Sequence, residues 1–367
     1  MTWRTPSETA LQAQTWMAFP MSDRLSDETT EERRSARATW AAVANAVVDF
    51  QPVTVVVDPA ERGAAARCLS RRVTVIEAPL NDAWMRDIGP TFVLDEAGRL
   101  GAVDWVFNGW GWTGPRSGWD KDNRIGRFVG QAAGAEYIGS QLVNEGGGIN
   151  VDGNGTVLLT DTVQLDSGRN PRLSRQQVEA EMRRTIGATN AVWLPYGLAR
   201  DYEPAGTRGH VDIVATIPSP GTVLVHDQRD PSHPDHERCA RLRRVFEEST
   251  DAAGRSWKVL SVPAPKVLRD YDGFVDYSYI NHAVVNGAVI ACSFDDPNDA
   301  VAVEILGTMY PGRTVVTIDA RPLFARGGGI HCITQQQPAT RARSVPNFTG
   351  LNVLHPGDCT SDSAAGR

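Results

Sequence analysis

Residues 284–290 read Val284-Val285-Asn286-Gly287-Ala288-Val289-Ile290, two apolar runs separated by an Asn-Gly pair. Such a pair between apolar runs is the strongest short-range signal for a β-hairpin. Similar strand–turn–strand patterns surround Gly98, Gly155 and Gly221. The intervals are 57 residues from Gly98 to Gly155, 66 from there to Gly221 and 66 from there to Gly287. A quasi-repeat of this size predicts tandem or radial structural units.

Usually one helix candidate lies between successive hairpins. Before the first hairpin, Trp40, Val43, Val47 and Phe50 recur at helical spacing behind a charged segment. Three helices are expected over 28–50, 235–250 and 299–310, the last of them ended by Pro311-Gly312. A further helix is expected between Ser174, an N-cap with Gln177 three residues on, and Gly187, a C-cap. Strands are expected over 53–57 and 73–78, with an Ala-rich helix between them.

The recurrence of two strands and a helix favours an α/β fold in one domain, residues 1–355, built of repeated units. An irregular α+β fold with accidental spacing is the alternative. Residues 356–367 are polar and glycine-containing, and are expected to form a loose tail.

Composition narrows the classes of function. The formal net charge of −7 and the lack of a basic cluster argue against a nucleic-acid partner and suit a cationic ligand. The chain has five widely spaced cysteines, which argues against a disulfide framework and favours a reducing, cytoplasmic location. Neither an apolar leader nor a run of about 18 apolar residues occurs, so we expect no membrane association.

Four short polar and glycine-rich clusters lie beside predicted strands. The first, residues 84–90, contains Arg86 and Asp87, and a carboxylate there can accept bidentate hydrogen bonds from a guanidinium. A structural Arg–Asp pair is the alternative. The second, residues 144–150, contains Glu145 and three glycines, which allow a ligand to approach the backbone closely. A tight turn with a solvated Glu145 is the alternative.

The third and fourth clusters add an imidazole and a thiol. If residues 209–215 form a strand, His210 and Asp212 point to the same face, as an acid/base and a second carboxylate anchor. Residues 327–334 place Cys332 in a glycine-rich turn, where it is predicted to be an exposed nucleophile. The alternatives are a surface histidine and an inert buried cysteine. The latter is the reading adopted for the cysteines at 68, 239 and 292.

A fifth group, His226, His233, His236 and Cys239, resembles a metal cluster only superficially. The spacing matches no standard ligand set, so a polar loop leading into a helix is the preferred interpretation. No metal is therefore expected.

The four clusters together suit guanidinium hydrolysis. The central carbon is a poor electrophile because its charge is spread over three nitrogens. Carboxylates can hold the planar fork, a thiolate can attack, and an imidazole can protonate the departing ammonia and then activate water. Asp87, Glu145, His210, Asp212 and Cys332 supply this set of groups.

The sequence also resembles the agmatine deiminase family, which is related to bacterial-type peptidylarginine deiminases. The matching stretches run in family order from Trp84 to Ala339: WMRDIGPTF, VDWVFNGWG, WDKDN, NEGGGINVDGNGT, GHVD and GGGIHCITQQQPA. The resemblance implies a five-bladed α/β propeller of ββαβ-type pseudo-repeats around a central substrate funnel. It also implies hydrolysis of agmatine to N-carbamoylputrescine and ammonia, without metal or organic cofactor, by a homo-oligomer in polyamine metabolism.

The resemblance assigns roles to individual residues. It implies Cys332 as nucleophile, His210 as acid/base and Glu145 as partner of both the histidine and the guanidinium. Asp87 and Asp212 would anchor the guanidinium, and Trp84 would line the pocket.

The chain departs from the family pattern at three positions near the site. Gly329 stands where Asn is common, Arg208 where a small amide or acid is common, and Asn150 where His is frequent. Gly329 and Arg208 are therefore further substrate-binding candidates. Arg208 or Arg326, pointing inward, would favour a carboxylate-bearing guanidino compound, such as a guanidino acid or an arginine derivative.

Agmatine's ammonium instead suits the aromatic faces of Trp110, Trp112 or Trp119. Three other functions compete with deimination: an amidinotransferase that passes the amidino group to an amine, a propeller that only binds ligands, and a metallohydrolase using the histidines at 226, 233 and 236.

Overall fold

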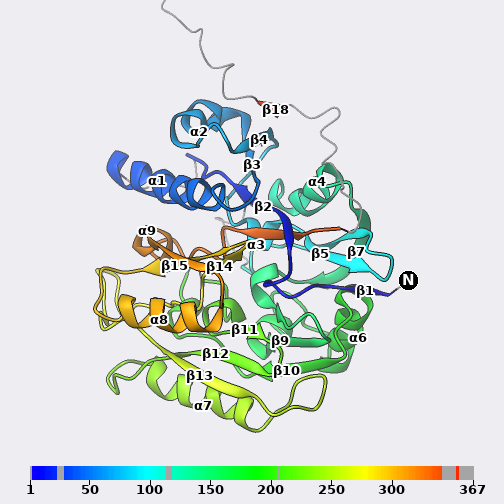
Figure 1. Cartoon of the computed structure of the whole chain (residues 1–367), viewed down its shortest axis with the longest axis vertical. Helices are drawn as coiled ribbons and strands as arrows, with labels where there is room; N and C mark the ends of the chain where they lie inside the picture. The colour runs from blue at the N-terminus through cyan, green and yellow to red at the C-terminus, as the bar shows by residue number, and fades with distance from the viewer. Residues whose placement is uncertain (1, 23–28, 113–117, 205, 341–352, 355–367) are drawn as a thin grey trace, which may run out of the picture.

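The computed structural model describes residues 2–22, 29–112, 118–204, 206–340 and 353–354. Within these residues the strands form five sheets, flanked by helices, in a mixed α/β fold (Figure 1). The predicted tail, residues 356–367, lies outside the described residues. No helix in the described part of the chain is long and apolar enough to cross a membrane.

Four of the sheets share one order of elements. An antiparallel hairpin leads into a helix, and the strand after the helix pairs parallel with the second hairpin strand. The four units are β5 (Thr91–Asp95), β6 (Leu100–Val106), α4 (Ile125–Ala132) and β7 (Glu136–Val143); β8 (Asn150–Val151), β9 (Thr156–Thr160), α6 (Arg175–Ile186) and β10 (Asn190–Leu194); β11 (Ala215–Ser219), β12 (Thr222–Asp227), α7 (Asp235–Glu247) and β13 (Lys258–Pro263); and β14 (Ala283–Val285), β15 (Ala288–Ser293), α8 (Asp299–Met309) and β16 (Thr314–Asp319). All four predicted hairpins are confirmed.

The fifth sheet joins the two ends of the chain. Its strand order is β17-β2-β3-β4-β18, with β17 (Gln335–Pro338) antiparallel to β2 (Gln12–Ala18). The remaining strands are β3 (Val53–Val57), β4 (Thr74–Glu77) and β18 (Val353–Leu354), while β1 (Trp3–Arg4) pairs with β5. Helices α1 (Thr30–Val47) and α2 (Arg62–Cys68) lie with this sheet at one end of the molecule, and α7 lies at the other (Figure 1).

The predicted helices exist, but several are shorter than expected. The helix predicted over 28–50 ends at Val47, because its apolar periodicity continues into a turn whose Phe50 still packs on the core. Residue 28 lies outside the described residues, and Thr29 caps the helix by accepting a hydrogen bond from the Glu32 backbone. The helices predicted over 235–250 and 299–310 likewise end at Glu247 and Met309, and the strand predicted over 73–78 covers Thr74–Glu77.

The caps predicted for α6 are confirmed. The side chain of Ser174 accepts a hydrogen bond from the Gln177 backbone, and Gly187 takes a left-handed φ of 71°. In that conformation the backbone can pair with the last free carbonyls of the helix, and glycine adopts it with little steric strain.

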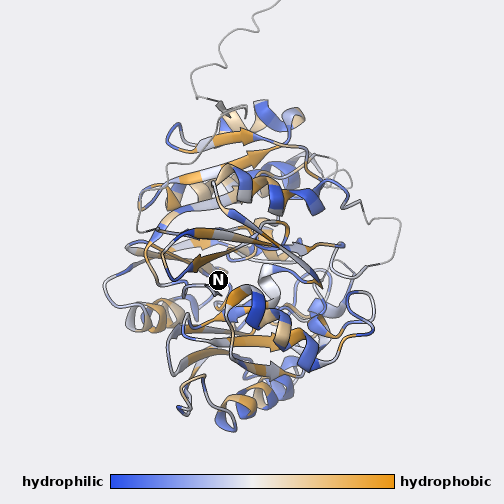
Figure 2. Cartoon of the chain, turned by 90° about the vertical axis from the view of Figure 1, so that its right-hand side faces the viewer, coloured by the Kyte–Doolittle hydropathy of each residue, from blue (hydrophilic) through white to orange (hydrophobic). Residues whose placement is uncertain are grey.

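Apolar strands form the interior. The largest hydrophobic cluster joins residues from both ends of the chain, among them Trp16, Trp40, Val285 and Ile333. Figure 2 shows apolar strands between helices that carry both hydrophobic and hydrophilic residues. This amphipathic pattern is typical of helices that cover a sheet.

Buried glutamines reinforce the pairing of β2 with β17. Gln337 Oε1 accepts hydrogen bonds from Gln14 Nε2 (2.8 Å) and from Trp16 Nε1 (2.9 Å), and all three side chains are buried. Thr54 Oγ1 in turn donates to Gln14 Oε1 at 2.7 Å, which extends the network to β3. A buried polar network stabilises a structure when its members are satisfied.

We expect Gln337→Leu to lower the free energy of unfolding by about 3 kcal/mol, because each buried donor left without an acceptor costs about 1–3 kcal/mol. Urea unfolding measures the change. Gln336→Leu, at the neighbouring half-buried position on the other face of β17, is the matched control and should change stability much less. Equal effects of the two variants would show that the network adds nothing specific.

Candidate active site

Each of the four polar clusters lies just before a strand, namely β5, β8, β11 or β17. Asp87 belongs to the short helix α3 (Met85–Ile88), which precedes β5. Glu145 precedes η3 (Gly146–Gly148) and β8, and Cys332 lies in the turn before β17. His210 caps η5 (Val211–Ile213), which precedes β11. The prediction of a strand over 209–215 is therefore wrong before Ala215, and the turn, not strand alternation, orients His210 and Asp212.

His210 is buried between two carboxylates. Its Nε2 lies 3.2 Å from Glu145 Oε2, and its Nδ1 lies 3.8 Å from Asp87 Oδ1. Burial opposes the imidazolium, but the charges of Asp87 and Glu145 outweigh burial and raise the pKa of His210 to about 9. The imidazole is thus a proton donor near neutral pH.

Asp87 has two protein donors besides the nearby histidine. Its Oδ1 accepts from the Gly147 backbone at 3.0 Å, and its Oδ2 accepts from Trp110 Nε1 at 2.9 Å. Burial, helped by the charges of Asp212 and Glu145, raises the pKa of Asp87 to about 6, although His210 opposes that rise. Gly147 is required here, since a Cβ would lie 2.5 Å from His210 Nδ1.

Glu145 is fully buried, so the alternative of a solvated side chain is wrong. Arg169 Nε donates to both of its oxygens, at 2.9 and 3.1 Å, and Arg169 Nη2 donates to the Thr207 carbonyl. Burial alone would raise the pKa of Glu145, but the guanidinium of Arg169 and the contact with His210 outweigh it and lower the pKa. Glu145 is therefore an anion that also orients His210.

Cys332 is only 4% exposed, which corrects the prediction of an exposed nucleophile. Its Sγ lies 3.5 Å from Asp212 Oδ2 and accepts from Asn281 Nδ2 at 3.2 Å. Burial and the charges of Asp212 and Asp87 raise the pKa of the thiol well above its usual value. The glycine-rich turn lies against Asn281 and not at the surface, since the backbone N–H groups of His331 and Cys332 donate to Asn281 Oδ1 at 3.0 and 3.4 Å.

Burial does not separate Cys332 from the other cysteines, but its neighbours do. Cys292 lies in the same hydrophobic cluster as Cys332, and Cys239 lies in another; burial raises the pKa of each of these two thiols, at 239 and 292, to about 12. Cys68 is half-buried at the end of α2. Among these four, Cys332 is the thiol within 3.5 Å of a carboxylate oxygen.

The two carboxylate oxygens of Asp212 have different surroundings. Its Oδ2 accepts from His331 Nδ1 at 2.8 Å, while its buried Oδ1 has no hydrogen-bond partner among the described residues. His210 Nδ1 likewise has no such partner in the described part of the chain. Buried polar atoms are nearly always paired, so these two atoms mark where a ligand can bind.

Sequence reasoning missed Glu8, Arg86, Arg169, Asn281 and His331 as parts of the site. Arg86 Nε donates to the His331 carbonyl at 3.3 Å, and its backbone N–H donates to the Cys332 carbonyl at 3.0 Å. The repeat could have revealed Asn281, because it lies two residues before β14, much as Asp87 lies four residues before β5. Nothing local marked Glu8 or Arg169.

Two of the predicted substrate-binding residues lie beside the thiol. A Cβ on Gly328 would lie 2.7 Å from the Trp84 ring and 3.1 Å from Cys332 Sγ, so Trp84 and the sulfur flank this glycine. Trp84 also packs edge-on against Trp40, with ring centroids 5.3 Å apart. At Gly329 a side chain would meet Asn281 Oδ1 at 2.5 Å, so this residue can offer only its backbone to a ligand.

Arg208 is engaged by protein groups. Its Nη1 lies 3.2 Å from Asp166 Oδ1 and 3.3 Å from the Gly111 carbonyl, and its guanidinium lies 5.0 Å from the ring of Trp112. Arg326 donates to the backbone carbonyls of Pro322 and Glu32. Both cations are thus held by contacts other than a substrate.

The tryptophans differ in their contacts. Trp110 donates to Asp87, Trp112 donates to the Gly206 carbonyl at 2.8 Å, and Trp119 packs partly buried against the largest hydrophobic cluster.

Two histidines at the start of α7, one in the preceding loop and one in its first turn, bond to the backbone. His233 Nε2 lies 3.0 Å from the Val275 carbonyl, and His236 Nδ1 lies 3.0 Å from the Gln228 carbonyl. Across the described ranges, no group of three or more His, Cys, Asp or Glu side chains is placed to hold a metal ion.

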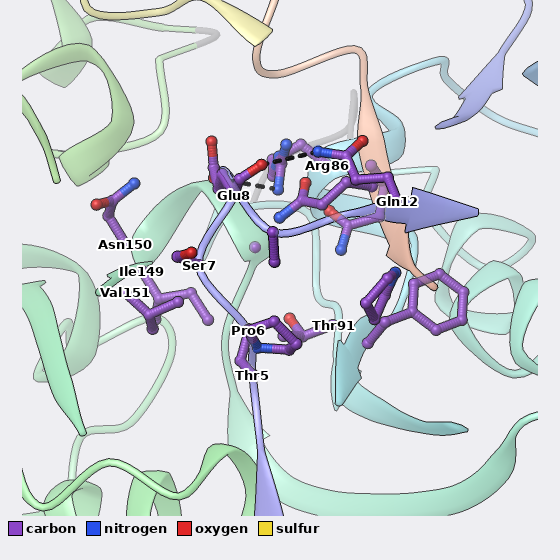
Figure 3. A pocket seen from close by; sticks show the side chains of 16 residues that line it. Thr5, Pro6, Ser7, Glu8, Gln12, Arg86, Thr91, Ile149, Asn150 and Val151 are labelled. Atoms are coloured by element: carbon purple, nitrogen blue, oxygen red, sulfur yellow. Dashed lines mark hydrogen bonds and ion pairs between the residues drawn. The ribbon is translucent and has the colours of Figure 1, made fainter. Parts of the chain in front are cut away.

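A pocket lined by both polar and apolar residues adjoins the site on the side of the N-terminal segment (Figure 3). Glu8 and Arg86 line it, and the Glu8 carboxylate also bonds to His331, the residue before the thiol. Asn150, where the family frequently has His, lines this pocket as well.

Known proteins match the chain along most of its length. The model of the Porphyromonas-type peptidyl-arginine deiminase family matches residues 4–338. A relative from Streptomyces coelicolor is 55% identical over 344 residues, which cover 93% of this chain and 100% of that protein. The agmatine deiminase of Stutzerimonas stutzeri is 38% identical, with 92% of this chain and 96% of that protein covered.

A solved structure of the Enterococcus faecalis agmatine deiminase matches with a TM-score of 0.84 at 32% identity, covering 93% of this chain and 97% of that one. The family resemblance noted in the sequence motifs is thereby confirmed: the chain belongs to the agmatine deiminase family, and it is matched by the model of the Porphyromonas-type peptidyl-arginine deiminases.

Proposed function

We propose that this protein hydrolyses the guanidinium group of agmatine to N-carbamoylputrescine and ammonia, with Cys332 as covalent nucleophile. The observation that carries the proposal is the buried cluster of one thiol, one imidazole and three carboxylates, with Asp212 Oδ1 and His210 Nδ1 left unpaired among the described residues. A planar cation with several N–H donors fits the carboxylate oxygens of this cluster. The names of the relatives support agmatine as the cation.

The substrate binds with its guanidinium between Asp87 and Asp212, and Glu145 adds a third negative charge. The cation offsets these carboxylates and so favours loss of the Cys332 proton to solvent. The thiolate then attacks the guanidinium carbon and forms a tetrahedral adduct. His210 protonates one nitrogen, which leaves as ammonia, and a thiouronium remains on the sulfur.

Hydrolysis of the thiouronium uses the same histidine in the opposite sense. Neutral His210 takes a proton from water, the hydroxide adds to the carbon, and the C–S bond breaks to release the ureido product. Glu145, held by Arg169, keeps His210 oriented through both halves. The chemistry uses groups of this chain and water, without metal or organic cofactor.

The five sheets also fit the blades of a propeller around a central funnel, in a single domain over residues 1–355. Four repeated units and the pairing of the chain ends support this arrangement. A cytoplasmic location and a homo-oligomeric state stay predictions.

Replacing the nucleophile tests the covalent step. We expect Cys332→Ala to reduce kcat for ammonia release from agmatine by about 10³-fold or more, as for other covalent nucleophiles. The control is Cys68→Ala, which removes a half-buried thiol from α2 and should leave kcat nearly unchanged. Near-normal turnover of Cys332→Ala would end the covalent proposal.

The ionisation of the thiol gives a second test. Because the pKa of Cys332 is raised well above its usual value, the free enzyme carries a neutral thiol near pH 7, and the rate of alkylation by iodoacetamide should still rise with pH beyond 9. A short, unreactive guanidinium analogue should speed alkylation at pH 8, since it offsets the carboxylates. A low pKa that the analogue does not change would contradict the model.

Substrate choice is tested by kcat/KM for agmatine, arginine and a guanidino carboxylic acid of similar length. Because Asp166 pairs with Arg208, we expect agmatine to exceed the acid by tenfold or more. If the acid wins by tenfold and Arg208→Ala erases the preference, agmatine is the wrong substrate. Transfer of the amidino group to an added amine, in place of a ureido product, would indicate an amidinotransferase.

A further inference from the structure

His331, the residue before the nucleophile, lies between two buried carboxylates. Its Nδ1 is 2.8 Å from Asp212 Oδ2, and its Nε2 is 2.8 Å from Glu8 Oε1. The ring is 3% exposed, so water does not compete freely for these contacts. Glu8 comes from the segment before β2, and Asp212 comes from η5.

This geometry fixes the protonation state of the ring. A neutral imidazole has one N–H donor, so one of its nitrogens would face a carboxylate lone pair to lone pair. An imidazolium has two donors and satisfies both carboxylates. The three groups then form a line of alternating charge: Glu8 negative, His331 positive and Asp212 negative.

The surrounding charged and titratable groups are compatible with that assignment. Arg86 Nη1 lies 3.8 Å from Glu8 Oε1 (Figure 3), and it opposes protonation of His331. His282 bonds to the Tyr279 carbonyl and the Tyr310 hydroxyl, and burial lowers its pKa to about 4, so it is neutral.

The pKa directions of the three groups agree with the line of charges. Burial and Arg86 oppose the cation on His331, but Glu8 and Asp212 outweigh them and raise its pKa. Burial opposes the anion on Glu8, yet His331 lowers the pKa of Glu8 to about 2. Asp212 is likewise lowered against burial, chiefly by its hydrogen bond to His331.

We propose that Glu8 and His331 are positioning residues: Glu8 keeps a proton on His331, and this imidazolium is the fixed cation that offsets Asp212 beside the Cys332 thiol. Asp212 Oδ2 contacts both His331 Nδ1 and Cys332 Sγ, so the cation and the thiol share one carboxylate oxygen. The inference rests on the proposed function, in which Cys332 must ionise, and it adds a charge held within the fold to the one that the substrate brings.

Glu8→Gln is the decisive variant. A glutamine amide can donate to a neutral Nε2, so the hydrogen bonds survive while His331 loses the partner that holds its proton. We expect alkylation of Cys332 by iodoacetamide at pH 8 to slow by about tenfold, because an opposite charge within about 4–6 Å shifts a pKa by about one unit or more.

The pH dependence separates this role from a merely structural one. The raised pKa of His331 means that its charge is present at lower pH and is lost as pH rises. Without Glu8 that loss moves to lower pH. For agmatine, kcat/KM of Glu8→Gln should therefore fall about tenfold below wild type at pH 8.5 and recover to within a few-fold at pH 6. The KM should not rise, since the carboxylates that hold the guanidinium remain.

The matched control is Glu61→Gln, which neutralises another buried carboxylate, one paired with Arg37 away from the site. It should change stability without changing the pH dependence of kcat/KM. A loss in Glu8→Gln by the same factor at every pH would overturn the proposal.

A third measurement depends neither on turnover nor on the folding of Glu8→Gln. ¹⁵N NMR of the wild-type protein should show both ring nitrogens of His331 protonated at pH 7.5, with His331→Gln used to assign the signal. A neutral ring at that pH would overturn the proposal. If the wild type releases no ammonia from agmatine, the proposed substrate fails, while NMR and alkylation still decide the role of Glu8 and His331.

Discussion

The pairing of β17 with β2 is the interaction on which the site depends. The register that matches Gln335 with Trp16 fixes β17 and, three residues before it, the turn that holds Cys332. Glu8, four residues before β2, reaches His331 through the turn that precedes its own strand. These residues are more than 320 positions apart in the chain, and no local preference could hold them. The glutamine and tryptophan hydrogen bonds between the strands make a slip of register costly, because a slip would leave buried donors unpaired. The fold therefore fixes the electrostatics of the thiol as well as its position.

The sequence predicted the scaffold better than the pairing of side chains. The Asn-Gly turn and its three counterparts identified four hairpins, because turn residues between apolar runs are a local signal. The polar clusters before the strands could be predicted as site segments for the same reason, because each is a local run of polar and glycine residues beside an apolar run. Residues 209–215 do not form the strand considered for them. The apolar run after Asp212 resembles a strand, but His210 and Asp212 belong to a turn. The partners Glu8 and Arg169 could not be predicted, because their roles arise from contacts between distant segments.

Charge balance explains why the site tolerates so many buried ions. Asp87, Glu145 and Asp212 would destabilise one another if each were unpaired, since a buried charge without a partner costs several kcal/mol. Arg169 holds Glu145, and His331 holds Asp212. That leaves Asp87 with a raised pKa and His210 as its nearest cation. The least compensated carboxylate is thus the one that gains most from an incoming guanidinium. A bound cation compensates the negative charge at Asp87 that the fold leaves uncompensated, and this gives the site a physical basis for selecting a cation.

The same balance constrains how a buried thiol can act as a nucleophile. A thiolate at Cys332 in the empty site would add a negative charge next to Asp212, so the free enzyme favours the unreactive thiol. On the proposed mechanism the substrate supplies the missing positive charge, and reactivity appears only when a guanidinium is in place. A fixed cation at His331 makes ionisation of the thiol easier, but it does not replace the substrate's charge, because Glu8 and Asp212 already neutralise most of the positive charge on His331. The thiol would then be protected from unrelated electrophiles in the absence of substrate, at the cost of a slower ionisation step than an exposed cysteine would have.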